Sequence, residues 1–233
     1  MKAAYETKLA ERKEALKDFF GGNDGEEVTD EMLKRVFQYE ELMIKYRSAI
    51  REVTTKLEIL NDELSTFTEH NPIESIQSRI KRPYSIAGKL NKLNKPIEVE
   101  AISKYLNDVA GIRVICSFID DIYDVAELLL KQDDVVLIAQ KDYIKNPKAN
   151  GYRSLHLIIE TPVFFSTGKE MIRVEIQIRT VAMDFWASLE HQIRYKNNAP
   201  DVQIIADELK ACADTIAQTD AKMQQLKKRI QAQ

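Results

Sequence analysis

The stretch Arg173-Val-Glu-Ile-Gln-Ile-Arg179 alternates polar and apolar residues without a break. Side chains on a β-strand point alternately to the two faces of the sheet, so this period of two predicts a strand. Its apolar residues would point into a core, and its other face would carry Glu175, Gln177 and the two arginines. A strand with one solvated face is the simple alternative, because such strands are common in antiparallel sheets.

The segments on either side of this strand favour a functional interpretation. Upstream lies Asn150-Gly-Tyr-Arg-Ser-Leu-His156, which is rich in hydrogen-bonding side chains. Directly downstream, residues 180–196 include Trp186, Glu190 and His191. Two polar-faced strands and an aromatic helix that carries acids and bases together predict the floor and wall of a binding site.

The composition is that of one domain of ordinary size with appended helices. Of the 233 residues, 44% are hydrophobic and 30% are charged. The longest apolar runs, such as Val135 to Ala139, are too short to cross a bilayer, and the N-terminus lacks a signal-peptide pattern. Cys116 and Cys212 lack the spacing of metal ligands, so we expect reduced thiols, no zinc and a cytoplasmic location.

The charge is unevenly distributed, although its sum is only −3. Residues 1–78 contain 17 acidic and 11 basic side chains, whereas residues 79–95 contain six basic and no acidic ones. A short basic patch in an acidic protein suits a small polyanion better than a long one, so no stable nucleic-acid partner is expected. The alternative is the solvated basic face of a helix.

Long segments near both ends of the chain have the apolar spacing of helices. Thr29 is placed to cap a helix over 29–67, whose apolar residues recur three and four apart, and residues 202–230 repeat this spacing. We favour helices used for oligomerisation, although intramolecular packing explains the spacing nearly as well. Another helix over 1–20 would end at the glycine-rich break 21–25, which lacks the ending of a phosphate-binding loop.

The central part of the chain alternates between helix and strand patterns. The expected helices cover 85–93, 99–108, 122–131 and 181–196, and the expected strands cover 112–118, 135–142, 154–160 and 171–179. The last two strands would form a hairpin. This order predicts an α+β fold with a mixed, partly antiparallel sheet flanked by helices. We expect N-terminal helices over 1–70 for oligomerisation or packing, a core over 71–198 and a C-terminal helix over 199–233.

Two carboxylates are candidates for the chemistry of the site. Glu175 lies on the polar face of its strand, and Asp108 is expected at the C-terminal end of a helix, just before a strand. An acid is unfavourable at the negative end of a helix, which suggests that Asp108 is more than a surface residue. The two side chains could serve one proton or one Mg²⁺ ion, which prefers such oxygen ligands.

The loop over 141–153 contains four basic residues, two asparagines and two tyrosines. Tyr143 or Tyr152 could stack on a nucleotide base, and the lysines could contact phosphates. A mobile surface loop without a ligand is the alternative.

Five motifs follow one another along the chain. They are Arg79-Ile-Lys-Arg-Pro-Tyr-Ser-Ile-Ala-Gly-Lys89, Asp108-Val-Ala-Gly-Ile-Arg-Val114, Gly151-Tyr-Arg-Ser-Leu-His156, Glu175-Ile-Gln-Ile-Arg-Thr180 and Met183-Asp-Phe-Trp-Ala-Ser-Leu-Glu-His191. From about residue 70 to residue 196, the chain closely resembles the small alarmone synthetases, the synthetase-only branch of the RelA/SpoT family. The resemblance implies a nucleotidyltransferase-like synthetase core and assembly into a homo-oligomer, expected to be a tetramer.

The resemblance also implies an activity. Members of this family transfer pyrophosphate from ATP to the ribose 3′-hydroxyl of GDP or GTP, which gives ppGpp or pppGpp and AMP in the stringent response. None of His70, His156 and His191 precedes an aspartate, as the family's hydrolase domain would require, so only synthesis is expected. Segment 73–77 has no aromatic residue where product-activated members carry one, so activation by the product is not expected.

Roles for individual residues follow from the resemblance. Asp108 would hold Mg²⁺, and Glu175 would share the metal or take the proton of the 3′-hydroxyl. The residues implied for ATP are Arg79 and Arg113, which would sandwich the adenine, and Lys81, Ser85 and Lys89, which would bind the phosphates. The residues implied for GDP or GTP are Lys148, Asn150, Tyr152, His156, Gln177 and Asp184.

On the guanosine side, Tyr152 would stack on guanine and Lys148 would contact phosphates. His156 and Gln177 would hold phosphate and ribose. Asp184 stands where some relatives carry asparagine, and its carboxylate could accept hydrogen bonds from the N1–H and amino groups of guanine. Arg179 would orient this face of the strand.

Two other functions are compatible with the sequence. Some relatives are toxins that transfer pyrophosphate to the 3′ end of tRNA, but the acidic flanking helices do not offer the broad basic surface this needs. The other is a catalytically inactive coiled-coil or RNA-binding module, which the heptad spacing suggests. Competent residues at every expected catalytic position argue against it.

Overall fold

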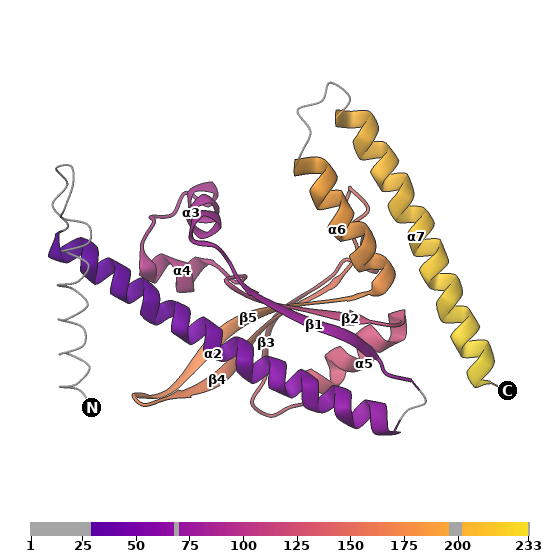
Figure 1. Ribbon diagram of the computed structural model, residues 1–233, viewed down its shortest axis with the longest axis horizontal. Coiled ribbons are helices and arrows are strands. Elements are labelled where there is room, and N and C mark those ends of the chain that lie inside the picture. The colour runs from indigo at the N-terminus through magenta and orange to yellow at the C-terminus, as the bar shows by residue number, and fades with distance from the viewer. Residues whose placement is uncertain (1–28, 68–69, 196–201, 233) are drawn as a thin grey trace.

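The computed structural model describes residues 29–67, 70–195 and 202–232, which form a five-stranded sheet with associated helices (Figure 1). The helices are α2 (Asp30–Phe67), α3 (Pro83–Lys92), α4 (Val99–Tyr105), α5 (Ile119–Leu130), α6 (Val181–Tyr195) and α7 (Val202–Gln231). The strands are β1 (Ile73–Ile80), β2 (Ala110–Cys116), β3 (Val136–Asp142), β4 (Leu155–Phe165) and β5 (Gly168–Thr180). The helix predicted over 1–20 and the break at 21–25 lie outside the described residues.

Strand β5 lies at the centre of the sheet, whose strand order is β1-β2-β5-β4-β3. It runs parallel to β2 and antiparallel to β4, and the outer pairs β1–β2 and β3–β4 are antiparallel. The predicted hairpin and the mixed, partly antiparallel sheet are confirmed. Because β5 pairs with β4 from Gly168 to Ile178 and with β2 from Glu175 to Thr180, the alternating side chains of its second half are held in register from both sides.

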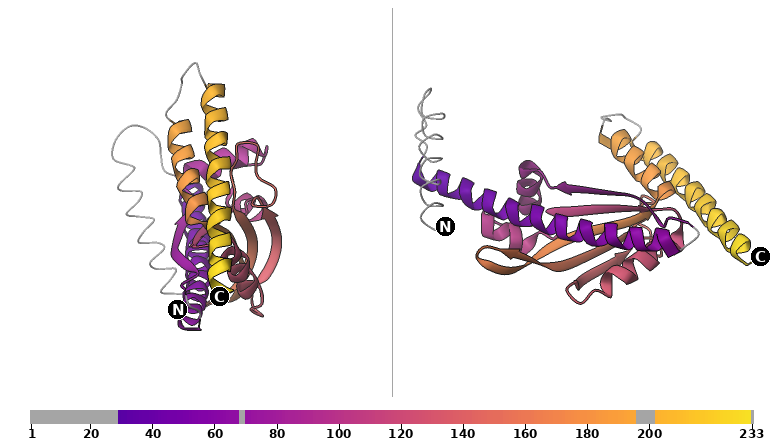
Figure 2. Two further views of the ribbon diagram at one scale, coloured as in Figure 1. Left: turned by 90° about the vertical axis from the view of Figure 1, so that its right-hand side faces the viewer. Right: turned by 60° about the horizontal axis from the view of Figure 1, so that its bottom comes forward.

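One face of the sheet is apolar, and α2 and α5 pack against it (Figure 1, Figure 2). Val174, Ile176 and Ile178 of β5 are each 0% exposed. They belong to the same core cluster as the buried residues of α2 and α5. Burying each such side chain contributes roughly 1.5–3 kcal/mol, so this face supplies much of the driving force for folding.

The apolar stripe of α2 is used mainly inside the chain. Its buried members against the sheet are Met43, Tyr46, Ile50, Val53, Leu57 and Leu60. Thr29 caps the helix as predicted, because its Oγ1 accepts the backbone N–H of Met32 at 3.2 Å. For the middle of this helix, the structure therefore shows the intramolecular alternative. Neither α2 nor any other helix of the described chain is long and apolar enough to cross a membrane.

Two predicted elements differ from the structure. Strand β1 was not predicted, because its isoleucines at 73, 76 and 80 have the spacing of a helix. A β-bulge between Ile73 and Ser75 shifts the alternation of side chains between the two faces by one residue. All three isoleucines therefore face the core, and Arg79 lies on a strand. The helix predicted over 99–108 ends at Tyr105. The expectation that Asp108 lies at a helix end is therefore wrong, and the charge mismatch inferred there does not arise.

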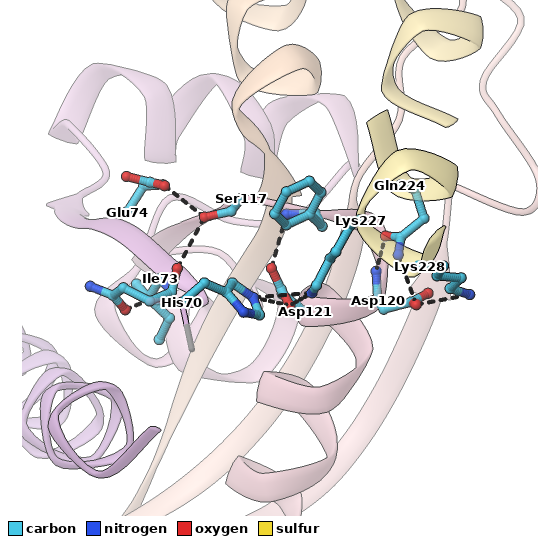
Figure 3. A network of polar contacts seen from close by, with 11 residues as sticks. His70, Ile73, Glu74, Ser117, Asp120, Asp121, Gln224, Lys227 and Lys228 are labelled. Atoms are coloured by element: carbon cyan, nitrogen blue, oxygen red, sulfur yellow. Dashed lines mark hydrogen bonds and ion pairs between the residues drawn. The ribbon is translucent and has the colours of Figure 1, made fainter. Parts of the chain in front are cut away.

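Helix α7 docks on the rest of the chain through polar side chains (Figure 3). Near its C-terminal end, Lys227 Nζ lies 2.7 Å from Asp121 Oδ1 and 3.0 Å from His70 Nε2. These contacts join α7 to the first turn of α5. Met223 and Leu226, on the same helix, remain 51% and 40% exposed. The helix thus turns polar residues inward and leaves part of its predicted apolar seam exposed.

Candidate active site

The second face of the sheet is polar, and the strand register places predicted site residues in rows across it. One row joins Arg79 of β1, Gly111 of β2 and Glu175 of β5. The next row joins Gln77, Arg113, Gln177, His156 and Lys141 across all five strands. Paired residues in neighbouring strands point to the same side of a sheet. Motifs that are far apart in the sequence therefore meet on this face.

Asp108 lies beside this face, in the loop before β2, and two lysines hold it. Lys81 Nζ and Lys89 Nζ lie 2.7 Å and 2.8 Å from Asp108 Oδ2. Burial raises the pKa of Asp108, but the hydrogen bonds and charges of the two lysines outweigh burial and leave the pKa below its ordinary value. Asp108 is therefore a carboxylate at neutral pH. Its Oδ1 atom is buried and has no hydrogen-bond partner among the described residues.

Glu175 is the second ionised carboxylate of the site. His156 Nδ1 lies 3.3 Å from its Oε1, and Gln177 Nε2 donates to its Oε2 at 3.0 Å. Burial raises the pKa of Glu175, but the contacts with His156 and Gln177 outweigh it and lower the pKa below its ordinary value. The charge of Asp108 acts to raise that pKa, so the two carboxylates lie within electrostatic reach of each other.

This pair of carboxylates fits a divalent cation. Mg²⁺ is commonly bound by one or two carboxylates together with substrate phosphates. The orphaned Oδ1 of Asp108 is costly to bury without a partner, which is the condition expected of a metal ligand. Within the described ranges, no cluster of three or more acidic, histidine or cysteine side chains could hold a metal. The remaining ligands would therefore come from substrate and water.

The first basic motif leads from β1 into α3. The backbone N–H of Lys81 bonds to the carbonyl of Val109 at 2.8 Å, which fixes the start of this turn beside the Asp108 loop. Pro83 begins α3, and Ser85 lies exposed in its first turn. The free N–H groups and positive dipole end of a helix suit phosphate. Lys81 and Ser85, which are predicted for ATP phosphates, therefore lie at one helix start. Lys89 lies in the last turn of α3, and its ammonium group reaches Asp108.

Tyr143, Tyr152 and His156 form an aromatic cluster next to Glu175. The ring centroid of His156 lies 5.2 Å from that of Tyr143 and 5.8 Å from that of Tyr152. Lys148 Nζ lies 4.6 Å from the ring centroid of each tyrosine. The hydroxyl of Tyr152 is 2.9 Å from His156 Nε2. The two ring nitrogens of His156 therefore contact Glu175 on one side and Tyr152 on the other.

Helix α7 anchors the base of the loop that carries Tyr152. Gly151 has a φ of 89°, and a Cβ at this position would lie 2.6 Å from the Cβ of Ala213. Both the backbone conformation and the close approach therefore require glycine. Arg153 Nη2 pairs with Asp214 Oδ1 at 3.0 Å. Sequence reasoning missed this anchor, because partners 61 residues apart share no local pattern.

Asn150, which was predicted to bind the guanosine nucleotide, has a second role in the loop. Its Oδ1 accepts the backbone N–H of Tyr152 at 3.2 Å. Its Nδ2 donates to Glu190 Oε1 of α6 at 3.2 Å. Asn150 therefore shapes the turn and ties it to α6.

Asp184, in the first turn of α6, lies between two arginines of the sheet. Its Oδ1 is 3.5 Å from Arg113 Nη1 and 3.5 Å from Arg179 Nε. These are ion pairs without good hydrogen-bond geometry, because Oδ1 and the Nε atoms of both arginines lack a hydrogen-bond partner in the described chain. Asp184, which was predicted to contact guanine, thus lies next to Arg113, which was predicted to contact adenine.

Two ionised carboxylates, several cations and an aromatic loop on one face of a sheet define a class of site that suits phosphate groups, a divalent cation and nucleotide bases. Residues 78–200 match the model of the region found in RelA/SpoT proteins, and the chain belongs to the RelA/SpoT family. It is 44% identical over 188 residues to GTP pyrophosphokinase YwaC of Bacillus subtilis (strain 168), covering 81% of this chain and 90% of that relative.

Solved structures agree with this assignment. The small alarmone synthetase 1 from Bacillus subtilis bound to its product pppGpp has a TM-score of 0.76 to this structure at 34% identity. The matched region covers 83% of this chain and 98% of that one. The same synthetase bound to AMPCPP gives a TM-score of 0.70 at 31% identity, again over 83% and 98%. The predicted α+β fold with long helices near both ends is confirmed.

Proposed function

We propose that this protein transfers pyrophosphate from ATP to the 3′-hydroxyl of GDP or GTP, which yields AMP and ppGpp or pppGpp. It would act in the cytoplasm, in the stringent response. The observation that carries the proposal is the pair of ionised carboxylates, Asp108 and Glu175, among basic side chains on the polar face of the sheet. Similarity to a GTP pyrophosphokinase and to a synthetase bound to pppGpp supports it.

ATP would bind along β1, β2 and the start of α3. The guanidinium planes of Arg79 and Arg113 would stack on adenine, and Lys81, Ser85 and Lys89 would contact the triphosphate. These cations neutralise the phosphate oxygens, so that an oxygen nucleophile can approach the β-phosphorus in line with the leaving group. AMPCPP, which is bound in the structure of a relative, has a carbon atom in place of the oxygen that bridges its α- and β-phosphates. In ATP, the proposed reaction would break the bond between that bridging oxygen and the β-phosphorus.

Asp108 would hold Mg²⁺ with support from Glu175. When bound, the ion would neutralise charge on the transferred phosphates. Lys81 and Lys89 lie within 2.8 Å of the same carboxylate. Their ammonium groups are therefore close enough to the metal ligand to contact the phosphates that the ion would bind.

GDP or GTP would bind at the loop that carries Tyr152. Tyr152 would stack on guanine, Lys148 would contact phosphates, and His156 and Gln177 would hold phosphate and ribose. Asn150 and Asp184 would complete this side, with the Asp184 carboxylate accepting from the N1–H and amino groups of guanine.

Glu175 would act as the general base. It would take the proton of the 3′-hydroxyl as that oxygen bonds to the β-phosphorus. The bond from the β-phosphorus to the bridging oxygen would break, and its electron pair would leave with AMP. Because the pKa of Glu175 lies below its ordinary value, the base is ionised throughout the neutral range.

We also propose assembly into a homotetramer through exposed apolar faces of the helices. On α6, Val181, Phe185, Leu189 and Ile193 recur every four residues and are 53%, 58%, 41% and 40% exposed. The exposed apolar residues of α7 add to this surface. Regular apolar stripes left in water are typical of interaction surfaces. Helix α2 and the segments over 1–70 and 199–233 that flank the core would contribute to these contacts.

Incubation of the protein with γ-³²P-ATP, Mg²⁺, GDP and tRNA tests the proposed reaction. The expected result is release of AMP and radiolabel in a guanosine tetraphosphate. Radiolabel in tRNA instead would support the toxin alternative. Absence of any transfer by folded protein would refute the proposed activity and favour the inactive module.

A further inference from the structure

Arg179 has the largest fully buried side chain in the described part of the chain, with only 2% of its surface exposed. A guanidinium keeps its charge at neutral pH, so burying it costs free energy unless hydrogen bonds and counter-charge compensate. Burial lowers the pKa of Arg179 below its ordinary value, and Asp184 and Tyr152 act against that shift whereas Arg113 and Arg79 add to it.

The contacts of Arg179 lead to the proposed base. Its Nη2 donates to Oε1 of Gln177 at 3.2 Å. On the other side of the same amide, Gln177 Nε2 donates to Oε2 of Glu175 at 3.0 Å. A guanidinium has only donors and a carboxylate only acceptors, so the amide between them has a single favourable orientation. The reversed amide would set donor against donor and acceptor against acceptor.

We propose that Arg179 is a positioning residue for Glu175 and acts through the side-chain amide of Gln177. The inference rests on the proposed function and assigns Gln177 a role besides the predicted contact with ribose or phosphate. His156 holds the other oxygen of Glu175 at 3.3 Å, so the carboxylate is fixed from both sides. Each carboxylate oxygen keeps acceptor capacity for the 3′-hydroxyl or the metal. The buried charge thus aims the base without contacting substrate.

Arg179→Met, Arg179→Lys and Gln177→Met test the relay by steady-state kinetics. We expect Arg179→Met to lower kcat by about 100-fold, because a misplaced catalytic group costs about that factor. The KM for ATP should stay within about threefold, because the relay holds the base and makes no contact with the residues proposed for the ATP phosphates. The KM for GDP should rise more, because Arg179 Nε also lies 3.5 Å from the Asp184 carboxylate proposed for guanine. Arg179→Lys keeps the positive charge and an N–H group that can donate to Gln177, so it should recover part of the rate.

Gln177→Met alone should give a similar loss, and combining it with Arg179→Met should add little, because both changes break one relay. Losses that multiply in the double variant would overturn the proposal. So would a fall in activity that follows only the loss of folded protein. Gln177→Met removes no buried charge and keeps the test available if Arg179→Met fails to fold.

Arg173→Met is the matched control. Arg173 lies on the same strand and the same face, but its Nη2 pairs with Glu160 at 2.8 Å and its Nη1 donates to Asn107 at 2.8 Å, so it takes no part in the relay. Because Asn107 precedes the proposed metal ligand Asp108, the control is read on the resonance of Gln177 and not on kcat. A measurement that needs no turnover tests the relay separately from the proposed synthetase activity. The side-chain amide resonance of Gln177 should shift in Arg179→Lys and stay in place in Arg173→Met, whether or not the wild type synthesises ppGpp. An unchanged resonance in Arg179→Lys would refute the relay alone.

Discussion

The two faces of β5 bury their side chains for different purposes. Ile176 and Ile178 are 0% exposed within an apolar core, whereas Arg179, one residue further, is 2% exposed among polar groups. On the apolar face, burial stabilises the fold. On the polar face it costs free energy that hydrogen bonds and ion pairs offset only in part. In the described chain, seven buried side-chain atoms lack a hydrogen-bond partner, and four of them belong to Asp108, Arg113, Arg179 and Asp184.

One strand thus supplies stability on one side and the groups for chemistry on the other. Unsatisfied buried groups are expected to be rare in stable folds. Their concentration beside two ionised carboxylates marks the polar face as the one adapted to a ligand. Changes on the two faces should therefore separate activity from stability.

Glu175→Gln should have the largest effect on activity. The change removes the base but nearly preserves size, so AMP release in single turnover should fall by about 1,000-fold. Thermal melting and ATP binding should change little. Glu160→Gln is the control, because Glu160 is also on this face and its carboxylate pairs with Arg173 and not with the proposed base or metal ligand. A rate for Glu175→Gln within tenfold of the wild type would contradict the assignment.

Ile176→Ala should have the largest effect on stability. The change leaves a cavity on the apolar face, and we expect the free energy of unfolding to fall by about 2–5 kcal/mol in chemical denaturation. The kcat of the protein that remains folded should stay within about threefold, since the carboxylates are on the opposite face. If kcat fell as far as in Glu175→Gln while the protein stayed folded, the two faces would not be separable.

Tyr152→Ala should act mainly on substrate binding. Loss of stacking on guanine costs about 1–3 kcal/mol, so the KM for GDP should rise by about tenfold or more while the KM for ATP hardly changes. Tyr152→Phe keeps the ring and removes only the hydroxyl next to His156, 2.9 Å away. It should therefore have the smaller effect. An unchanged KM for GDP in Tyr152→Ala would place guanine elsewhere.

Asp220→Asn should have the smallest effect. Burial raises the pKa of Asp220 in the folded protein, although the hydrogen bond from Thr180 acts against this. The ionised form therefore lowers stability at neutral pH, and this cost disappears as the pH falls below the ordinary value of about 3.9. Asparagine can still accept from Thr180, so melting should rise by about 2 °C at neutral pH and not in acid. A lower melting temperature at neutral pH would show that the charge stabilises α7.

Local patterns predicted the centre of the fold but not its edge. The alternation in 173–179 predicts β5 because a period of two is a property of neighbouring residues. Strand β1 has helix-like spacing, and its bulge depends on pairing with β2, so nothing in 73–80 alone identifies it. The apolar stripe of α2 predicted a packed face, but spacing cannot tell whether the partner is the chain's own sheet or another subunit.

The sequence predicted which residues form the candidate site better than it predicted the contacts between them. The motifs and the family resemblance identified Asp108 and Glu175. They did not indicate that Lys81 would bind Asp108 across 27 residues of sequence, or that α7 would hold Gly151 and Arg153. Such contacts depend on how the strands and helices are arranged in space. A single sequence carries no local signal for them.

The most direct test of the division between the two faces is a crystal structure of the protein with AMPCPP, GDP and Mg²⁺. The predicted result has the β-phosphorus and the 3′-oxygen together over the polar face of β5, with Glu175 in hydrogen-bond contact with that oxygen. Asp108 would contact the metal, and the residues on the apolar face would be unmoved. Nucleotides bound away from this face, or a 3′-oxygen far from Glu175, would contradict it.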